Sequence, residues 1–219
     1  MVATPIGNLE DITYRAVETL KKVDIIACED TRQSMKLLNH YGIKKHLISV
    51  RARNEKTSAP GVVKLLDEGK DIAYISDAGT PVLSDPGSIL VREVRGTDHS
   101  IVPIPGPNAF GALVSVSGFV GKAITFEGFL AQKSGKRKKR LEELLEREEG
   151  FIIYESPYRI VKLLTTIAEI NPERHLLIGR EITKSFEEFI QGSAKEVLEN
   201  MSTRATIKGE FAILVAGKE

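Results

Sequence analysis

The 219-residue sequence has little of several features that assign a chain to a protein class. Its single cysteine, Cys28, excludes an internal disulfide and a cysteine-rich zinc site. Its four histidines stand without the spacing of metal ligands, so we predict no metal site. A lone thiol suits a reducing compartment, and the chain is therefore expected to be cytoplasmic.

Excess charge of one sign and a long apolar run are also missing. The 31 Lys and Arg residues nearly balance the 30 Asp and Glu residues, so any attraction to nucleic acid must come from a local patch. The most apolar stretch, Phe110–Val120, is too short to span a bilayer and contains glycine and serine. We therefore predict no membrane role.

Three familiar site motifs do not occur. The loop after the first expected strand reads Thr-Pro-Ile-Gly-Asn from Thr4, not the G-x-G-x-x-G of dinucleotide-binding sheets. There is no G-x-x-x-x-G-K-[ST], so a P-loop nucleotidase is not supported. No arrangement of Ser, His and Asp or of Cys and His indicates an enzyme with a serine or cysteine nucleophile. A site on this chain must therefore be built in another way.

Short β-branched runs alternate with segments of helical periodicity, which predicts an α/β fold with two lobes, 1–105 and 106–219, and a cleft between them. The first lobe should carry a mainly parallel sheet covered on both faces. Its strands are expected at Met1–Thr4, Val23–Cys28, His46–Val50, Ile72–Ser76 and Ser100–Ile104, and its helices at Thr13–Lys22, Thr31–Tyr41 and Ser58–Glu68, the last capped by Ser58.

In the second lobe several expected strands are adjacent without room for a helical crossover, which predicts a mixed sheet. Its strands are expected at Ile124–Phe129, Phe151–Tyr154, Leu176–Gly179, Glu187–Gln191 and Glu210–Val215. Its helices are expected at Asn108–Ser117, Lys138–Glu149, Tyr158–Ile170 and Ala194–Met201.

Unusual loops follow four strands of the first lobe, at 4–8, 29–32, 77–87 and 105–109. Ligands of open α/β sheets bind beyond the carboxyl ends of the strands, so these loops are predicted to line a ligand cleft. The loop Asp77–Gly87 holds two glycines, two prolines and two aspartates, a composition that fixes a backbone path beside a ligand. The same composition also suits a plain turn.

Two charged segments permit both a structural and a functional interpretation. Asp30 is at least as well explained as the N-cap of the helix from Thr31, whereas Glu29 and Arg32 are not explained by capping and suit an anionic ligand. The basic run 133–140 precedes several glutamates. It fits a solvated helix with pairs such as Lys138–Glu142 and Lys139–Glu143, or a contact with a phosphate backbone.

Six motifs, taken in order, carry a resemblance to a known family. They are Val-Ala-Thr-Pro-Ile-Gly-Asn-Leu from Val2, Ala-Cys-Glu-Asp-Thr-Arg from Ala27, Ser-Asp-Ala-Gly-Thr-Pro from Ser76, Pro-Ile-Pro-Gly-Pro-Asn-Ala from Pro103, Tyr-Glu-Ser-Pro-Tyr-Arg from Tyr154 and Lys-Gly-Glu-Phe from Lys208. Together they resemble the bacterial enzymes that methylate the 2′-hydroxyl of a cytidine in 16S ribosomal RNA, within the tetrapyrrole methylase superfamily. The resemblance implies S-adenosylmethionine as cofactor, the small ribosomal subunit as substrate, and a homodimer.

Carried onto this sequence, the resemblance implies three sets of site residues. Cofactor contacts are expected at Pro5, Gly79, Thr80, Leu83, Asn108, Ala109, Tyr154, Arg180, Glu181, Lys208 and Gly209. RNA contacts are expected at Arg32, Lys136, Arg137, Lys139 and Arg159. The carboxylate that takes the proton of the hydroxyl is one of Glu29, Asp30, Asp77 and Glu155, without an order among them.

The sequence departs from the family pattern at four places. Asn108 stands where serine is usual, Tyr158 where histidine is usual, and 50–53 where a Tyr-His-Glu-His-like segment is usual. Several residues usually precede the position of Val2, so we expect the first strand to be cut short. Two other functions stay open: a methylase of corrins or porphyrins, and an RNA-binding ribosome assembly factor without catalysis.

Overall fold

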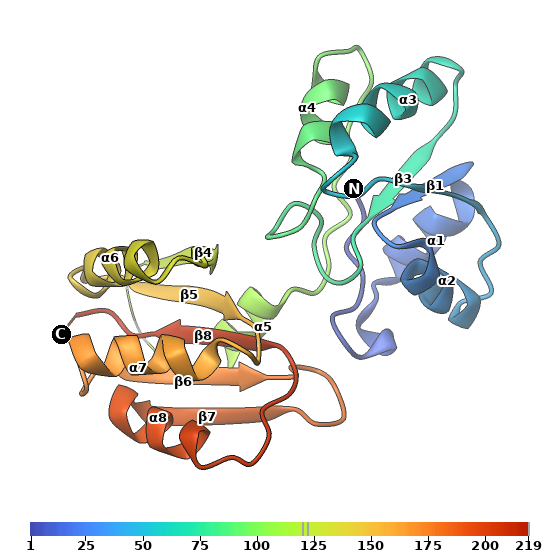
Figure 1. Cartoon of the computed structure of the whole chain (residues 1–219). Coiled ribbons are helices and arrows are strands. Elements are labelled where there is room, and N and C mark those ends of the chain that lie inside the picture. The colour runs from blue at the N-terminus through green and yellow to red at the C-terminus, as the bar shows by residue number, and fades with distance from the viewer. Residues whose placement is uncertain (120, 122, 219) are drawn as a thin grey trace. The chain divides into compact units, whose positions relative to one another are not determined.

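The computed structural model describes residues 1–119, 121 and 123–218. Val120, the last residue of the apolar stretch Phe110–Val120, lies outside them. The chain divides into two compact units, unit 1 (Met1–Asn108) and unit 2 (Ala109–Glu219). Each unit has its own sheet and its own hydrophobic core (Figure 1).

Unit 1 is a parallel sheet with helices on both faces, as predicted. The strand order is β2-β1-β3, and β1 pairs in parallel with both neighbours. The strands are β1 (Ile25–Cys28), β2 (His46–Ser49) and β3 (Ile72–Ile75). The helices are η1 (Leu9–Asp11), α1 (Tyr14–Lys22), α2 (Thr31–His40), α3 (Glu55–Asp67) and α4 (Ser88–Arg95).

Successive side chains of the short strands point to opposite faces of the sheet, so the core of unit 1 has two layers. Ile26 and Cys28 point to the face covered by α1 and α2, whereas Ala27 and Tyr74 point to the face covered by α3 and α4. Because both faces are covered, β1 and β3 carry almost no polar side chains. The first polar groups therefore appear where the strands end.

The expected strands Met1–Thr4 and Ser100–Ile104 are present only as isolated bridges. Val2 pairs in parallel with Ile104, and the N–H of Val2 donates to the carbonyl of Tyr74 at 2.9 Å. Proline stands at positions 103 and 105 and again at position 5, and proline has no N–H to donate. The first segment therefore lies beside β3 and the second beside the first, without forming a continuous ladder.

The start of α3 differs from the prediction. The helix begins at Glu55 with Asn54 at its N-cap, so Ser58 is not the cap; its N–H donates to the carbonyl of Asn54 at 2.9 Å. In addition, no helix was predicted at α4. That helix is short, and its buried face consists of only Leu90 and Val94, which is too brief a pattern to stand out.

The buried carboxylate of Glu55, the first residue of α3, caps α4. Gly87, the N-cap of α4, has no side chain to cap the helix and lies at φ 123°. Instead Oε1 of Glu55 accepts the N–H groups of Ile89 and Leu90 at 2.8 and 2.9 Å. The end of the loop 77–87 is thus fixed by a residue from a different helix.

Unit 2 has a five-stranded mixed sheet, as predicted, in the order β4-β5-β8-β6-β7. β4 and β5 are parallel, whereas β8 is antiparallel to both β5 and β6. β4, β5 and β6 therefore run in one direction and end at the same edge. The strands are β4 (Ile124–Phe129), β5 (Gly150–Glu155), β6 (His175–Arg180), β7 (Glu188–Ser193) and β8 (Phe211–Val215).

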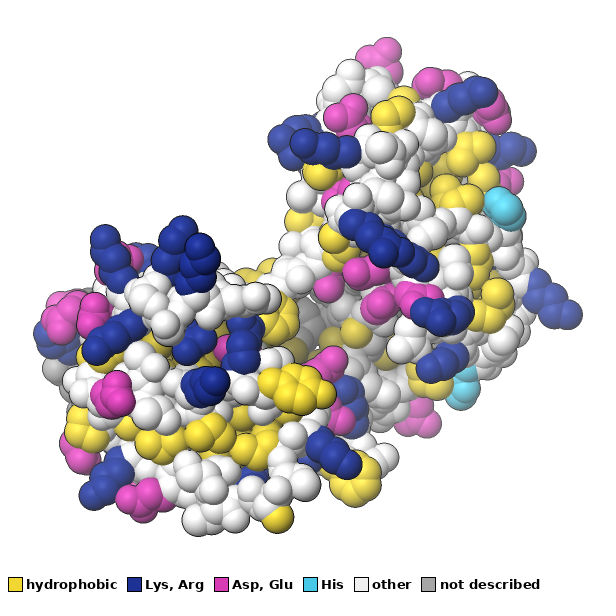
Figure 2. All heavy atoms as spheres, viewed as in Figure 1, with side chains coloured by type: hydrophobic (Ala, Val, Ile, Leu, Met, Phe, Trp, Pro, Cys, Tyr) yellow, Lys and Arg dark blue, Asp and Glu magenta, His cyan; other side chains and the backbone are white. Residues whose placement is uncertain are grey.

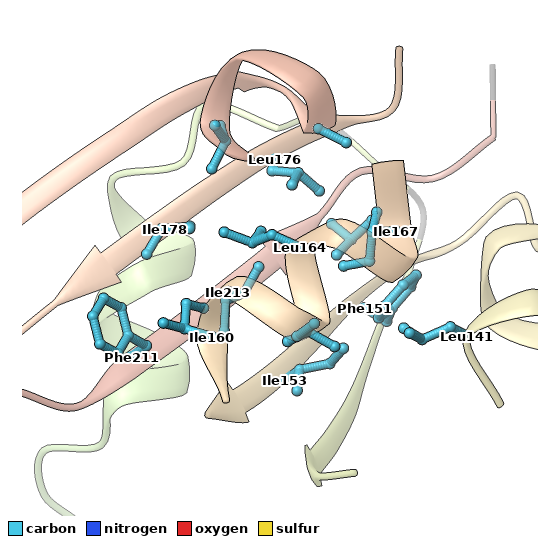
Figure 3. Close-up of a cluster of buried hydrophobic side chains, with 14 of the residues drawn as sticks. Leu141, Phe151, Ile153, Ile160, Leu164, Ile167, Leu176, Ile178, Phe211 and Ile213 are labelled. Carbon is cyan, nitrogen blue, oxygen red and sulfur yellow. The ribbon is translucent and has the colours of Figure 1, made fainter. Parts of the chain in front are cut away.

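The helices of unit 2 pack mostly on one face of this sheet. α6, α7 and α8 contribute Leu141, Leu164 and Met201 to a core that also contains Phe151 and Ile213 (Figure 3). α5 packs against the other face, where Leu113 lies close to Gly179. The helices are α5 (Ala109–Ser115), α6 (Ser134–Leu145), α7 (Ile160–Ile170) and α8 (Ala194–Ser202).

The prediction for α6 was wrong at its start, because most of the basic run is itself helical. The helix begins at Ser134, four residues before the expected Lys138, with Lys133 at the N-cap. Lysine and arginine favour helix, and only one glycine, Gly135, interrupts the run. Among the described helices, none has both the length and the apolar character that crossing a membrane requires.

We predict that Glu55→Ala lowers the free energy of unfolding by about 1–3 kcal/mol, because two buried N–H groups of α4 lose their acceptor. Urea denaturation followed by circular dichroism measures the change. Glu55→Gln keeps an oxygen acceptor and is expected to cost less. Equal midpoints for the wild type and the alanine variant would contradict this capping role.

Candidate functional site

The loops at the carboxyl edge of unit 1 are joined by backbone hydrogen bonds. The N–H of Thr4 donates to the carbonyl of Gly79 at 2.9 Å, and the N–H of Gly79 donates back to Thr4 at 3.0 Å. The hydroxyl of Thr80 reaches the carbonyl of Pro107 at 3.4 Å. Three of the loops that the sequence analysis selected therefore meet at one place.

Gly79 is a residue that this junction requires. Its φ of +78° is a conformation that side chains rarely adopt, and an added Cβ would lie 3.2 Å from Cγ2 of Ile6. Further along the loop, Val82 and Ser84 have φ values of 74° and 65°. Positive φ at a β-branched residue is a genuine outlier, and such strain concentrates at ligand sites. The loop is thus held in one shape, as a backbone-lined site requires.

Three of the four candidate carboxylates gather at this same edge. Glu29 and Asp30 follow β1, and Asp77 follows β3, the strand beside it. The N–H of Asp30 donates to Oδ1 of Asp77 at 3.0 Å. The edge therefore brings together carboxylates that are far apart in sequence.

Glu29 has no cation bound to its carboxylate among the described residues, in contrast to Asp30, which binds Arg32. Partial burial and the charge of Asp77 raise its pKa above the ordinary value, against the opposing influence of Arg51. Arg51 donates from Nε to the carbonyl of Glu29 at 3.0 Å. Arg51 was not among the predicted site residues; its place directly after β2 and Val50, at the same edge, is the signal that could have found it.

Asp30 has the capping role that the sequence left open. Its Oδ1 accepts the N–H of Arg32 at 2.9 Å, and its Oδ2 accepts from the guanidinium of Arg32 at 2.9 Å. These bonds to Arg32 lower the pKa of Asp30 to about 2. The side chain of Arg32 is nevertheless 86% exposed, so it can also meet an external anion.

The cofactor residues predicted in unit 2 form a second cluster. Nε of Arg180 donates to the carbonyl of Lys208 at 2.7 Å, and the N–H of Glu210 donates to Oε1 of Glu181 at 2.9 Å. Gly209 lies so close to Glu181 that an added Cβ would be 2.5 Å from its Cγ. The structure thus brings Arg180, Glu181, Lys208 and Gly209 together.

Glu155, the fourth candidate carboxylate, lies at the end of β5 in unit 2. Its side chain is fully buried and pairs with Arg159, whose Nε donates to Oε1 at 2.7 Å. The same oxygen accepts the N–H of Ser156, and Oε2 has no described partner. These contacts make Glu155 an anchor for Arg159 and the start of α7.

The side chains of the basic run 133–140 differ in burial. Lys136 and Lys139 are exposed, whereas Arg137 is buried on the inner face of α6 and its Nε has no described partner. The pairs expected for Lys138 and Lys139 are not found among the described residues; Arg140 pairs instead with Glu127 and Glu143. Figure 2 shows lysine and arginine side chains gathered over the part of unit 2 that holds α6.

The remaining predicted residues lie in or beside the two clusters. In unit 1, Pro5 is buried, Leu83 is half-buried in the loop 77–87, and Asn108 follows Pro107. In unit 2, Ala109 begins α5, and the ring of Tyr154 stacks edge-on against Phe126 and Phe129. No group of three or more His, Cys, Asp or Glu within the described chain can hold a metal ion.

A cavity of about 370 Å³ lies elsewhere in unit 1. It is lined by apolar side chains at the amino end of β3, beside Asp71 and Ile72, and by Val102. None of the predicted site residues lines it. The predicted site therefore does not depend on this cavity.

Comparison with known sequences gives one family. The model described as Tetrapyrrole (Corrin/Porphyrin) Methylases matches residues 1–198. Ribosomal RNA small subunit methyltransferase I of Borrelia garinii is 46% identical over 99% of this chain and 97% of its own length. The protein of the same name in Thermotoga maritima is 45% identical over 100% and 98%, and that of Bacillus subtilis 43% identical over 99% and 74%.

Comparison with solved structures supports the fold. The methyltransferase CobJ matches with a TM-score of 0.72 at 17% identity, covering 96% of this chain and 90% of that one. A cobalt precorrin-4 methyltransferase matches with a TM-score of 0.71 at 14% identity, covering 98% and 92%. At such low identity the likeness concerns the fold and not the substrate.

We predict that Gly209→Ala lowers the free energy of unfolding by about 1–3 kcal/mol, because the new Cβ needs φ +99° and displaces Glu181. Gly135→Ala is the matched control in the same unit: it lies in α6 with open space around it, and alanine favours helix. Denaturant titration should show a loss for the first variant and no loss for the second. Equal midpoints would show that the Gly209 turn tolerates a side chain.

Proposed function

Since the chain belongs to the tetrapyrrole (corrin/porphyrin) methylases and, within them, to the ribosomal RNA small subunit methyltransferase I family, we propose that it methylates the 2′-hydroxyl of a cytidine in 16S ribosomal RNA. The observation that carries the proposal is identity of 43–46% to proteins of that name over nearly the whole chain. We further propose that it acts in the cytoplasm as a homodimer.

S-adenosylmethionine is the proposed methyl donor, and when bound it supplies a methyl group on a positively charged sulfur. The fixed backbone of Gly79, Thr80 and Leu83, with Pro5 and Asn108 beside it, fits a ligand that is held mainly by main-chain groups. In unit 2 the proposed contacts are Ala109, Tyr154, Arg180, Glu181, Lys208 and Gly209.

We assign the role of general base to Glu29. The 2′-hydroxyl must lose its proton as its oxygen bonds to the methyl group, and a carboxylate with a raised pKa is a better acceptor. Asp30 is less suited because Arg32 holds its pKa at about 2, and Glu155 because it is fully buried against Arg159. Asp77 is exposed and supports Glu29 through its charge.

The proposed RNA contacts differ in accessibility. Arg32, Lys136 and Lys139 are exposed and are the phosphate contacts we propose first. Arg137 is buried in α6, and Arg159 is half-buried and paired with Glu155. We therefore propose that both support the residues they contact more than they bind phosphate. Mutation of Lys136 and Lys139 should therefore weaken RNA binding more than mutation of Arg137.

The two alternative functions are less well supported. A corrin or porphyrin methylase accounts for the fold but not for the names of the more similar relatives, which share 43–46% identity against 12–17% for the solved structures. An assembly factor without catalysis accounts for the basic run. It does not account for the strained loop, or for Glu29 beside Asp77.

Transfer of labelled methyl from S-adenosylmethionine to undermethylated small ribosomal subunits tests the proposal. We expect label on a cytidine 2′-oxygen of 16S RNA, and none on subunits that already carry the methyl group. Calorimetry with the cofactor separates the alternatives, because a non-catalytic factor would bind RNA but no cofactor. Cofactor binding with label on a porphyrin and none on the RNA would overturn the proposal.

We predict that the rate falls as the pH falls through the raised pKa of Glu29, since the base must be ionised. Asp77→Asn removes a neighbouring negative charge but keeps an oxygen for the N–H of Asp30. The pKa of Glu29 then decreases, and the acid limb of kcat/KM shifts to lower pH. Glu29→Gln should lose roughly 10²–10⁴-fold in kcat. If the acid limb of kcat/KM stays at the same pH in Asp77→Asn, Glu29 is not the general base.

A further inference from the structure

Three aromatic side chains of unit 2 are more than half exposed although nothing in the proposed chemistry uses them. The exposed fractions are 56% for Phe129, 91% for Tyr158 and 76% for Phe186. Aromatic rings bury a large apolar area, and single exposed apolar residues are common on protein surfaces. Three such rings in one unit need a common explanation only if they share a location.

The sheet topology gives them that location. Phe129 is the last residue of β4, Tyr158 follows the end of β5, and Phe186 lies in the loop after β6. These three strands run in the same direction, because β8 is antiparallel to both β5 and β6. The rings therefore lie along one edge of the sheet, which we call the aromatic edge, on strands spaced about 4.8 Å apart in the order β4-β5-β8-β6.

At this edge the ring of Phe129 and the loop that carries Phe186 are held in place. Phe129 contacts Tyr154 edge-to-face with ring centroids 5.9 Å apart, and Tyr154 contacts Phe126 in the same way at 5.0 Å. The loop of Phe186 is tied by the N–H of Thr183, which donates to Oε2 of Glu187 at 2.6 Å. A ring with a fixed position loses little conformational entropy when it stacks on a ligand.

The charge beside Phe129 and Tyr158 is positive. The segment 129–140 has six lysines and arginines and no acidic residue, and 156–162 has two and none. The acidic groups that precede these segments are engaged: Glu127 pairs with Arg140, and Glu155 with Arg159. The loop of Phe186 differs, because its Lys184 is shared by Glu181 and Glu210 and its Glu187 is exposed. Rings beside Lys133 and Lys136, which are exposed and have no acidic partner among the described residues, match a ligand that has both flat bases and phosphates.

We propose that the aromatic edge binds single-stranded RNA, with bases stacked on Phe129, Tyr158 and Phe186 and phosphates against Lys133 and Lys136. Unpaired bases splay out and stack on aromatic side chains, whereas A-form duplex keeps its bases stacked inside. The edge therefore selects an unpaired stretch of the proposed rRNA substrate over a duplex. This inference rests on the proposed function for the identity of the RNA.

The test measures binding of a short fluorescein-labelled single-stranded RNA by anisotropy across a series of salt concentrations. Phe129→Ala, Tyr158→Ala and Phe186→Ala should each weaken binding roughly 10-fold without changing its salt dependence. Lys133→Gln and Lys136→Gln should each flatten the slope of log K against log salt by about 0.7. The matched controls Phe129→Tyr, Tyr158→Phe and Phe186→Tyr keep a ring and should bind as the wild type does.

Activity with small ribosomal subunits distinguishes a failure of the proposed RNA site from a failure of the proposed function. If the wild type methylates the subunits and the alanine variants keep its RNA affinity and its KM, the aromatic edge is not the RNA site. If the wild type transfers no methyl while the alanine variants lose RNA affinity, the RNA site stands and the proposed function fails.

Sedimentation velocity tests the alternative that a second copy of this chain covers the aromatic edge. We expect all variants to keep the mass of the wild type. A lower mass for the alanine variants, restored in the ring-keeping controls, would make the aromatic edge an interface between protomers and overturn the RNA assignment.

Discussion

The paired backbone hydrogen bonds between Thr4 and Gly79 hold the carboxyl edge of unit 1 together. They join the first loop to the strained loop 77–87, which Thr80 then ties to Pro107. Glycine favours this pairing, because the position needs φ +78° and an added Cβ would lie 3.2 Å from Cγ2 of Ile6. Asp77 stands two residues before Gly79 and is placed by the same bonds, so the environment of Glu29 depends on them as well.

The two units contribute different chemistry to the proposed reaction. Unit 1 supplies a rigid main-chain cradle and a carboxylate whose pKa is raised by burial and by a like charge. Unit 2 supplies cations and exposed rings at the edge where β4, β5 and β6 end. The glycine and threonine of the loop 77–87 suit cofactor binding through the backbone, whereas we assign the proposed proton transfer to Glu29 on the neighbouring loop.

The sequence predicted the parts of the fold that depend on local pattern. Buried β-branched runs located the strands of both sheets, and the positions of the loops predicted the edge where Glu29 and Asp77 meet. It failed where a distant residue decides the outcome. The cap of α4 comes from Glu55 on α3, and no rule of local spacing predicts that contact. The burial of Glu155 and Arg137 likewise follows from packing and not from residue type.

A crystal structure with S-adenosylhomocysteine bound tests the central claim most directly. We expect the ligand on the main chain of Gly79 and Thr80, with the carboxylate of Glu29 facing the sulfur. A ligand bound in the cavity at the amino end of β3, or a sulfur facing Glu155 with Glu29 turned away, would contradict it.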